Sequence, residues 1–298
     1  MSQFTAINLA LIPAPQVIEV IDYEQVLAEM LADLAARLPE FDTFLESDPV
    51  MKLLEVAAYR ETVLRQRINE AAKAVMLSYA MDTDLDQLGA TFGVTRLEVT
   101  PADPDASPPT AAVFEKNSDF RYRIQLSLEG LSTAGPEGAY IFHALSADGL
   151  VLDASAISPT PGEVLVTVLS RDGDGTASAE LLAAVEASLS AEDVRPLTDF
   201  VQVQGATIVP YQVEAALYFY AGPDRTVIMA TAQAAIEAYT ESQHRLGLDV
   251  TLSGIYAALH QPGVQRVELT EPAATLVIDR QSASYCTAIA LTDGGLDE

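Results

Sequence analysis

Two aspartates in the string RDGDG are the residues of this sequence best placed to bind a cation. Asp172 and Asp174 are one residue apart, as are the first ligands of an EF-hand calcium loop. The twelfth position of such a loop needs a bidentate Glu, and the sequence has Ala183 there. We therefore interpret the string as a tight Gly-rich turn from a strand into a helix, capped by Thr176 or Ser178, and predict that it binds no metal.

A second acidic cluster consists of Asp82, Asp84 and Asp86. Carboxylates spaced by two residues do not share one face of a helix, so they do not converge on a ligand. At the start of a helix they instead meet free backbone N–H groups and the positive end of the helix dipole. We interpret this cluster as the N-terminus of a short helix that ends at Gly93.

The residues that could act as a nucleophile or a base lack the partners that catalysis requires. Cys286 has no histidine near it in the sequence, and His143 and His260 show no metal-ligand spacing. A general base needs an oriented partner, and the sequence shows none. It also contains no G-x-S-x-G elbow, no P-loop and no dinucleotide-binding fingerprint. We therefore expect no catalytic residues, no metal and no cofactor.

The composition limits the partners that the protein can have. The chain of 298 residues has 16 Lys and Arg against 43 Asp and Glu, which gives a formal net charge of −27. Phosphate neutralisation needs clustered cations, and anionic membranes repel an acidic surface, so we expect neither nucleic acid nor membrane as a partner. Hydrophobic residues make up 49% of the chain, which supports a real core, and the length predicts two domains.

The cysteine count and the N-terminal sequence indicate where the protein is made. A single cysteine excludes an internal disulfide framework and a Cys-based zinc cluster. The N-terminal segment has no basic region typical of a signal peptide, and no run of about 18 apolar residues suggests a membrane span. We expect a soluble protein made in a reducing compartment.

The first third of the chain is predicted to be helical. Residues 1–21 look like an apolar, partly extended arm, and residues 22–99 look like a helical bundle region. Asp22 is expected to cap one helix, and Asp48 followed by Pro49 is expected to start a second, longer one. Apolar residues recur in this second helix at near-heptad spacing, so we expect it to pack in a bundle within its own chain or with another. The predicted partner-helix interface consists of Val50, Leu54, Ala57, Leu64, Ile68 and Val75.

A change in composition marks the domain boundary. Residues 100–117 include TPADPDASPPT, which has four prolines and no periodicity, so we predict a semi-rigid linker. Residues 118–210 and 211–298 behind it are predicted to form two mixed α+β domains. Residues 118–131 fit both a helix and an alternating strand, and periodicity alone does not decide between them. The predicted fold class is therefore α+β, with an N-terminal helical bundle segment followed by mixed α+β domains.

One long strand in the last domain is amphipathic. Its residues Val213, Leu217 and Phe219 lie on one face, and Tyr218 and Tyr220 lie on the other. Aromatic side chains are typical anchors of protein interfaces. We predict that these five residues belong to an interface with another subunit. The alternative is that they complete an internal core.

A faint echo links the two α+β domains. The segments GAY at 138–140 and GIY at 254–256 each open a short predicted helix. A glycine, a hydrophobic strand and a proline follow in the same order both times. Either a duplication that makes the two units related or chance would explain so short a match.

Several longer segments are similar to those of a known family. LSTAGPEGAY at 131–140 and RPLTD at 195–199 are the most specific, and DPVMKLLEVAAYRETVLRQRINEAAKAVML and TDLDQLGATFGV accompany them in the N-terminal part. Together they resemble the baseplate assembly protein J family of contractile-tailed bacteriophages and of the related R-type pyocins. The resemblance covers about residues 22–270. It favours a helix for residues 118–131.

The resemblance implies a structural role, and the family offers no catalytic residues. Its members are wedge subunits of the baseplate, the hexagonal plate that closes the distal end of a contractile tail and triggers sheath contraction. Two copies associate with one smaller, I-type wedge protein, and the wedges join around the hub and spike. Because the family builds rings, the resemblance implies that the interface predicted at Val213, Leu217, Tyr218, Phe219 and Tyr220 closes a ring of subunits. A lysozyme-like protein connects the plate to the sheath. We therefore expect this chain, with these partners, in the baseplate of a virion or tail particle that is assembled in the cytoplasm of the host bacterium.

A competing hypothesis comes from a different class of protein. The chain could be a soluble enzyme or a metal-binding module of unknown substrate, built on the RDGDG turn. That hypothesis predicts a concave pocket with convergent polar groups and shifted pKa values. An assembly subunit instead predicts exposed apolar surface that becomes buried only in a complex.

Overall fold

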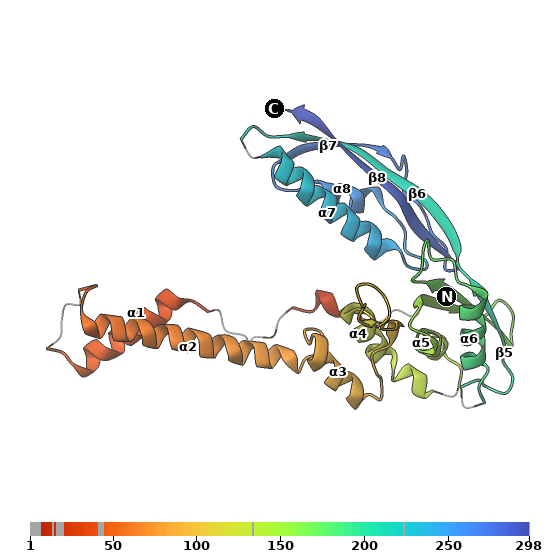
Figure 1. Cartoon of the computed structure of the whole chain (residues 1–298), viewed down its shortest axis with the longest axis horizontal. Coiled ribbons are helices and arrows are strands. Elements are labelled where there is room, and N and C mark those ends of the chain that lie inside the picture. Colours follow the sequence, from red (N-terminus) through yellow and green to blue (C-terminus); the bar gives the residue numbers. More distant parts are fainter. Residues whose placement is uncertain are drawn as a thin grey trace. The chain divides into compact units, whose positions relative to one another are not determined.

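The computed structural model describes residues 7–13, 15, 21–40, 45–132, 134–192, 194–222 and 224–297. The chain divides into a helical unit within residues 5–95 and an α+β unit within residues 96–298. Figure 1 shows the helices and strands of both units with their labels. Most of the arm predicted at residues 1–21 lies outside the described residues.

The described part of the helical unit contains the 3-10 helix η1 Leu9–Leu11 and the α-helices α1 Tyr23–Arg37, α2 Pro49–Ala74 and α3 Asp82–Thr91. Both predicted caps are confirmed. The Asp22 carboxylate accepts a hydrogen bond from the backbone N–H of Glu24 at 3.0 Å, and Asp48 accepts one from Val50 at 3.1 Å. Pro49 occupies the first turn of α2, where its missing N–H has no helical acceptor to lose.

Helices α1 and α2 share a small hydrophobic core. Val26 and Leu27 of α1 and Ala58 of α2 are buried in it, and a rim of partly buried side chains surrounds them. Arg65 of α2 adds a contact between the helices, with its guanidinium 3.8 Å from the Glu29 carboxylate of α1. The two helices therefore associate through one end of α2, and the rest of that helix has a large apolar surface left over.

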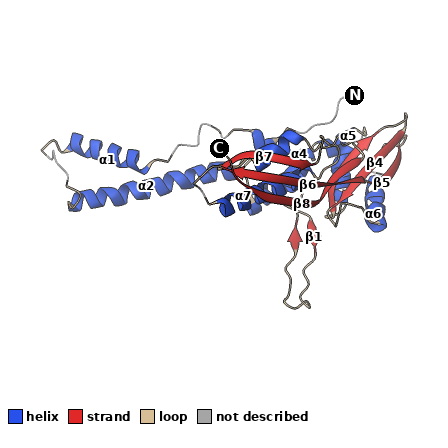
Figure 2. Ribbon diagram, turned by 90° about the horizontal axis from the view of Figure 1, so that it is seen from above, coloured by secondary structure: helices blue, strands red, loops and turns tan. Residues whose placement is uncertain are grey.

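The proline-rich stretch contains a β-hairpin. Strands β1 Glu98–Thr100 and β2 Val113–Phe114 pair antiparallel, and an isolated bridge joins Asp103 to Thr110. Figure 2 shows β1 in this hairpin. Part of the linker predicted at residues 100–117 thus has regular structure, and the domain limits proposed from the sequence stay predictions.

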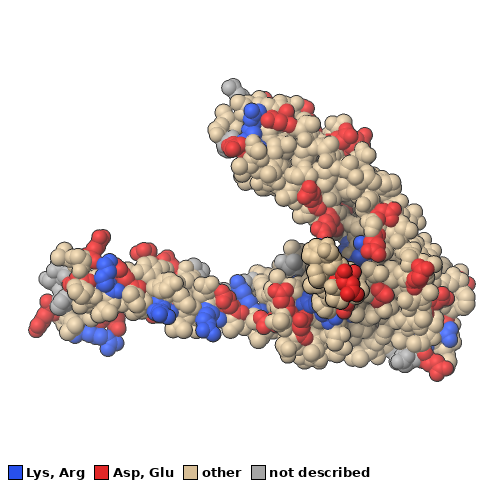
Figure 3. Space-filling model, in the orientation of Figure 1, with Lys and Arg blue, Asp and Glu red and all other residues tan. Residues whose placement is uncertain are grey.

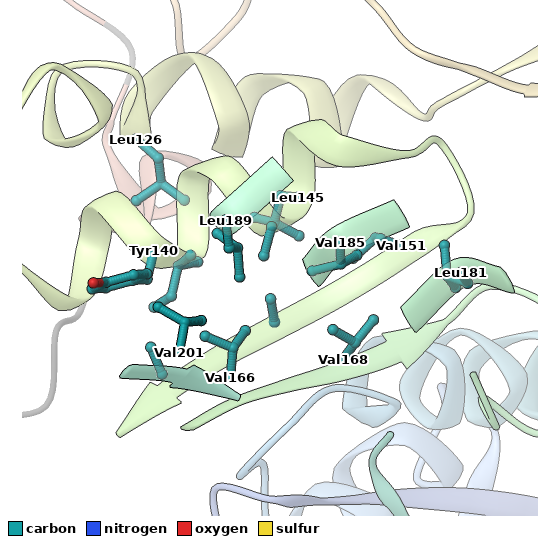
Figure 4. Close-up of a cluster of buried hydrophobic side chains, with 14 residues drawn as sticks. Leu126, Tyr140, Leu145, Val151, Val166, Val168, Leu181, Val185, Leu189 and Val201 are labelled. Atoms are coloured by element: carbon teal, nitrogen blue, oxygen red, sulfur yellow. The ribbon is translucent and has the colours of Figure 1, made fainter. Parts of the chain in front are cut away.

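The central subdomain, residues 117–205, places helices on one face of a three-stranded sheet. Its elements are α4 Asn117–Leu126, η2 Glu129–Leu131, α5 Glu137–Ala147, β3 Val151–Ile157, β4 Glu163–Ser170, α6 Ala179–Leu189 and β5 Phe200–Gly205. The strand order is β3-β4-β5, with β3 antiparallel and β5 parallel to the middle strand β4. Side chains from α5, α6 and the sheet meet in one core (Figure 4), which includes Tyr140, Val166 and Val185.

The ambiguous stretch 118–131 is helical, as the family resemblance favours. Phe120 and Ile124, four residues apart on α4, are at most 1% exposed, which gives the helix a buried face. Leu128 and Leu131 continue the same spacing, yet they are 64% and 78% exposed. The helical pattern therefore extends beyond the part of the segment that reaches the core.

The C-terminal subdomain, residues 207–296, has a second three-stranded sheet. Its elements are β6 Thr207–Phe219, α7 Arg225–Gln243, α8 Leu252–Leu259, β7 Val264–Glu271 and β8 Ser282–Leu296. The strand order is β7-β6-β8, with β7 antiparallel and β8 parallel to the middle strand β6. Apolar residues of α7, α8 and β6 form its core. The predicted α+β class is confirmed.

The two sheets have the same arrangement of strand directions. Each has a middle strand with one antiparallel and one parallel neighbour. In both, a short helix precedes the antiparallel edge strand, α5 before β3 and α8 before β7, and these are the elements of the sequence echo. The chain order of the other elements differs between the subdomains. A common origin of the central and C-terminal subdomains stays a prediction.

Candidate assembly interface

Helix α2 exposes most of the apolar residues predicted to form the partner-helix interface. Leu64 is 59% exposed, Ile68 is 65% exposed, and Val75, directly after the helix, is 71% exposed. Ala57 is also exposed, whereas Val50 and Leu54 are half-buried, and Leu54 packs against α1. Most of the predicted stripe is therefore open to a partner, and its N-terminal end is partly used within the unit.

Three further large side chains of α2 are exposed, and the sequence analysis missed them. Leu53, Val56 and Tyr59 are between 59% and 70% exposed. They lie between the positions of the heptad pattern, so a search for one stripe did not include them. Their spacing of three residues is a helical signal in its own right. The apolar surface of α2 is consequently wider than one stripe.

Helix α2 differs in charge from the rest of this acidic chain. It contains five Lys or Arg against three Glu, whereas the whole chain has a net charge of −27. Figure 3 shows Lys and Arg side chains along the stretch that Figure 1 labels α2. Glu61 pairs with Arg65 at 2.5 Å along the helix and neutralises one of them. The helix therefore presents an apolar surface flanked by cations.

Three of the five residues predicted to lie at a ring interface are buried and do not lie on the surface of the subunit. Val213, Leu217 and Phe219 of β6 are 0% exposed and belong to the core of the C-terminal subdomain. They point toward α7 and α8, which cover that face of the sheet. The alternative reading of an internal core holds for these residues, because strand alternation shows that a face is apolar and does not show what covers it.

Tyr218 and Tyr220 lie on the other side, and only Tyr220 is freely exposed, at 53%. The guanidinium of Arg266 stacks on the Tyr218 ring, 3.8 Å from its centroid, and the Tyr218 hydroxyl donates to Glu268 at 3.1 Å. The ring also covers Gly294, where a Cβ atom would lie 2.8 Å from it. Tyr218 is thus engaged within its own sheet.

A polar cluster joins the central and C-terminal subdomains. Asp119 of α4 accepts from Arg171 at 2.5 Å and from Arg245, which follows α7, at 2.8 Å. Arg245 also donates to the backbone carbonyl of Leu152 at 2.7 Å. Burial raises the pKa of Asp119, but the two guanidinium groups outweigh burial and hold it below the ordinary value. Burial raises the pKa of the neighbouring Asp153.

The RDGDG string forms the predicted turn between β4 and α6. The Asp174 carboxylate accepts from the Thr176 N–H at 3.0 Å, and Ser178 caps α6 by accepting from Leu181 at 3.2 Å. Gly175 has φ +97°, a value that favours glycine. Within the described ranges, no three His, Cys, Asp or Glu side chains form a group that could hold a metal ion. Absence of metal at this turn stays a prediction.

His143 and Cys286, for which no catalytic role is expected, make contacts within the fold. His143 lies with its Nε2 atom 3.2 Å from the Gly130 carbonyl. Cys286 is half-buried, burial raises the pKa of its thiol, and its Sγ atom donates to the Ala288 carbonyl at 3.4 Å.

The Asp82 cluster occupies the first turns of α3, as expected. In the part of the chain that the structure describes, no helix is long and apolar enough to cross a membrane.

The two most specific sequence segments, far apart in the chain, lie against each other. The Tyr140 hydroxyl donates to the Asp199 carboxylate at 2.7 Å. Gly135 has φ +71° and packs so closely that a Cβ atom there would lie 2.8 Å from Pro196. Leu197, beside this contact, is 99% exposed. The segments are thus tied together internally, and they leave one large apolar side chain free.

Taken together, these features define a class of protein, a component of an assembly, because α2 exposes a wide apolar surface that suits a macromolecular partner. Family models match three parts of the chain: the baseplate J-like N-terminal domain at residues 46–103, the baseplate J-like central domain at 132–205, and the baseplate J-like protein C-terminal domain at 211–292. The chain therefore belongs to the baseplate J-like family of structural phage proteins.

A curated relative and a solved structure accompany the family matches. Baseplate protein J of Escherichia phage P2 is 52% identical over 299 residues, which cover 98% of this chain and 99% of that protein. A chain in the cryo-EM structure of the anti-feeding prophage (AFP) baseplate, 6-fold symmetrised, is 15% identical with a TM-score of 0.41. That match covers 62% of this chain and less than half, 44%, of the other.

Proposed function

We propose that this protein is a wedge subunit of the baseplate of a contractile phage tail or of a phage-tail-like bacteriocin, and that it acts without catalysis. The observation that carries the proposal is the near full-length identity of 52% to a baseplate protein J. The exposed apolar surface of α2 supports it, since such surface on a helix of a water-soluble chain typically marks a contact with another protein.

Within the wedge, α2 is the element that we assign to partner helices. Leu64, Ile68 and Val75 provide the apolar contact, and the cations of α2 suit an acidic helix, such as one from a second copy of this acidic chain. The proposed partners are a second copy, a smaller I-type wedge protein, the lysozyme-like sheath-connecting protein, and the hub and spike. The α+β unit is proposed to make the contacts that close the ring.

The test compares Leu64→Asp with Gln66→Asp, which adds the same charge at an exposed polar position of the same helix. We expect Leu64→Asp to abolish co-purification of the wedge partners and to leave the circular dichroism signal of the α+β unit unchanged. Gln66→Asp should assemble normally, because position 66 lies on the side of the helix away from the stripe of Leu64, Ile68 and Val75. Normal wedge formation by Leu64→Asp would refute the assignment of α2.

A further inference from the structure

Strand β8 lies at the edge of its sheet with most of its outer side unpaired. It has 15 residues and pairs along its length with β6, and Figure 2 shows it at the margin of the sheet. Its own chain reaches the outer side at the beginning, where Leu246 bridges Ala283 and the Gly247 N–H donates to Ser282 at 3.1 Å. Beyond these residues, no other described strand pairs with the outer edge.

This edge lacks the side chains that usually protect a strand from pairing. No charged residue and no proline occurs from Ser282 to Thr292, although the chain has 59 charged residues in all. Bulges at Thr287 and Gly294 interrupt the pairing register of β8 with β6. Between the two bulges lies a regular, uncharged stretch, residues 288–292, which pairs with Gln212 to Ala216 of β6.

The inner face of this stretch is incompletely buried. Ile289 and Leu291 pair with Val213 and Ala215 of β6 and point into the same core. Val213 is 0% exposed and Ala215 is 4% exposed, whereas Ile289 and Leu291 stay half-buried. The difference arises because β6 has a strand on each side and β8 has none beyond it. Side chains of a further strand beside β8 would cover part of the surface that both residues still expose.

We propose that residues 288–292 of β8 pair antiparallel with the same residues of a second copy of this chain, an inference that rests on the proposed ring contact of the α+β unit. A two-fold axis at Ala290 places Ile289 of each copy opposite Leu291 of the other. It also places Ala288 opposite Thr292 on the outer face. The apolar side chains on the inner face of β8 then form one continuous row across the axis, from one copy to the other.

The absence of charge from residues 288–292 lets a second copy be the occupant. Two chains of net charge −27 repel each other over most of their surface, so they approach best where neither carries a carboxylate. In the proposed register, Asp293 of each copy lies opposite Thr287 of the other, so the two Asp293 side chains do not face each other. The strand that fits this edge is therefore an uncharged one, and β8 itself meets that requirement.

Disulfide trapping tests the register directly. In the full chain carrying Cys286→Ser, Ala290→Cys should give a covalent dimer on mild oxidation, because opposite Cβ atoms lie about 5 Å apart in an antiparallel pair. Ala288→Cys and Thr292→Cys should link when the two variants are mixed, and neither should link to itself. Glu214→Cys, exposed on β6 one strand inside the sheet, is the control that should not link.

A charge test uses Ala290→Lys and, as the matched control, Gln212→Lys on the same face of β6. Facing lysines should weaken dimerisation about tenfold or more in Ala290→Lys, and Gln212→Lys should dimerise like the wild type. The measurements are made on the purified chain and on tail particles that carry each variant. A dimer of Ala290→Cys in either sample supports the proposal. No dimer in both, or unchanged dimerisation of Ala290→Lys, overturns it.

These outcomes are separable from failure of the proposed function. If the wild-type chain is found in baseplates and Ala290→Cys does not link there or in solution, the β8 proposal fails and the wedge assignment stands. If the wild-type chain is absent from tail particles and Ala290→Cys still links in solution, the wedge assignment fails and the pairing of β8 stands.

Discussion

Asp119 is the residue through which two subdomains share one buried charge. Its carboxylate side chain is 10% exposed and meets Arg171, from the turn after β4, and Arg245, from the end of α7. A carboxylate so deeply buried is stable only while its partners compensate the loss of water. The contact between the central and C-terminal subdomains therefore depends on the arrangement of these three side chains.

We expect Asp119→Asn to destabilise the protein by about 3 kcal/mol at pH 7, because two guanidinium groups lose their buried partner. The pKa of Asp119 is held below its ordinary value of 3.8, so its stabilisation is complete above that pH and is lost as the pH falls through the lower, folded-state value. Urea unfolding at several pH values should show the difference between wild type and variant shrinking below about pH 4.

The matched control for this prediction is Asp33→Asn. Asp33 pairs with Arg37 at 3.0 Å, but both side chains are well exposed, so the change should cost at most about 1 kcal/mol. Burial raises the pKa of Asp153 in the wild type and in the variant, and a raised pKa has the opposite pH dependence. The Asp119 charge, a smaller cause, raises it further in the wild type only. A difference for Asp119→Asn that stays constant from pH 7 to the acid range would contradict the role assigned to its charge.

At the scale of elements, the hairpin of β1 and β2 is anchored to the central subdomain by close backbone packing. Gly149, in the turn from α5 into β3, lies against the backbone of Glu98 and Val99, and no Cβ atom would fit there. The Glu115 carboxylate, which follows β2, accepts from the Leu97 N–H at 2.9 Å and pairs with the buried Arg123 at 2.6 Å. The base of the hairpin is consequently a rigid part of the α+β unit.

Gly149→Ala should therefore destabilise the protein by about 2–4 kcal/mol, since a methyl group there would clash with backbone that has no room to move. Gly173→Ala is the control, because Gly173 has φ +61° and nothing within 4 Å of a built Cβ. It should cost about 1 kcal/mol from backbone strain alone. Thermal unfolding of both variants gives the comparison, and equal losses would argue against the close contact with β1.

At the scale of the whole molecule, the two units differ in how much core they contain. Of the 38 buried hydrophobic residues among the described ones, six lie within residues 5–95. The α+β unit holds the others, most of them in two cores beneath two sheets. We therefore expect a helical unit with so little buried apolar surface to need packing against partners for most of its stability.

This difference predicts how the two units behave when they are expressed separately. Residues 96–298 alone should unfold cooperatively, with one sharp transition in urea followed by circular dichroism. Residues 5–95 alone should be helical in part and unfold gradually, because the core of α1 and α2 has only three buried residues among the described ones. A sharp transition for the helical fragment would show that it needs no partner to be stable.

Local signals in the sequence were sufficient for some features of this protein. Asp22 and Asp48 start helices as predicted, because an N-cap depends on a carboxylate and on N–H groups two or three residues away. Ser178 caps α6 for the same reason. The family, too, could be recognised from sequence segments, since the resemblance rests on residue identity and needs no knowledge of contacts.

Tertiary structure decided which apolar residues face a partner and which face the core. Val213 and Leu217 have the same alternating pattern as any half-buried strand, and only the positions of α7 and α8 show that this face is covered. The free edge of β8 was also invisible in the sequence, because strand order depends on which segments pair across long chain separations. Periodicity reports the local geometry of an element, and burial depends on its neighbours.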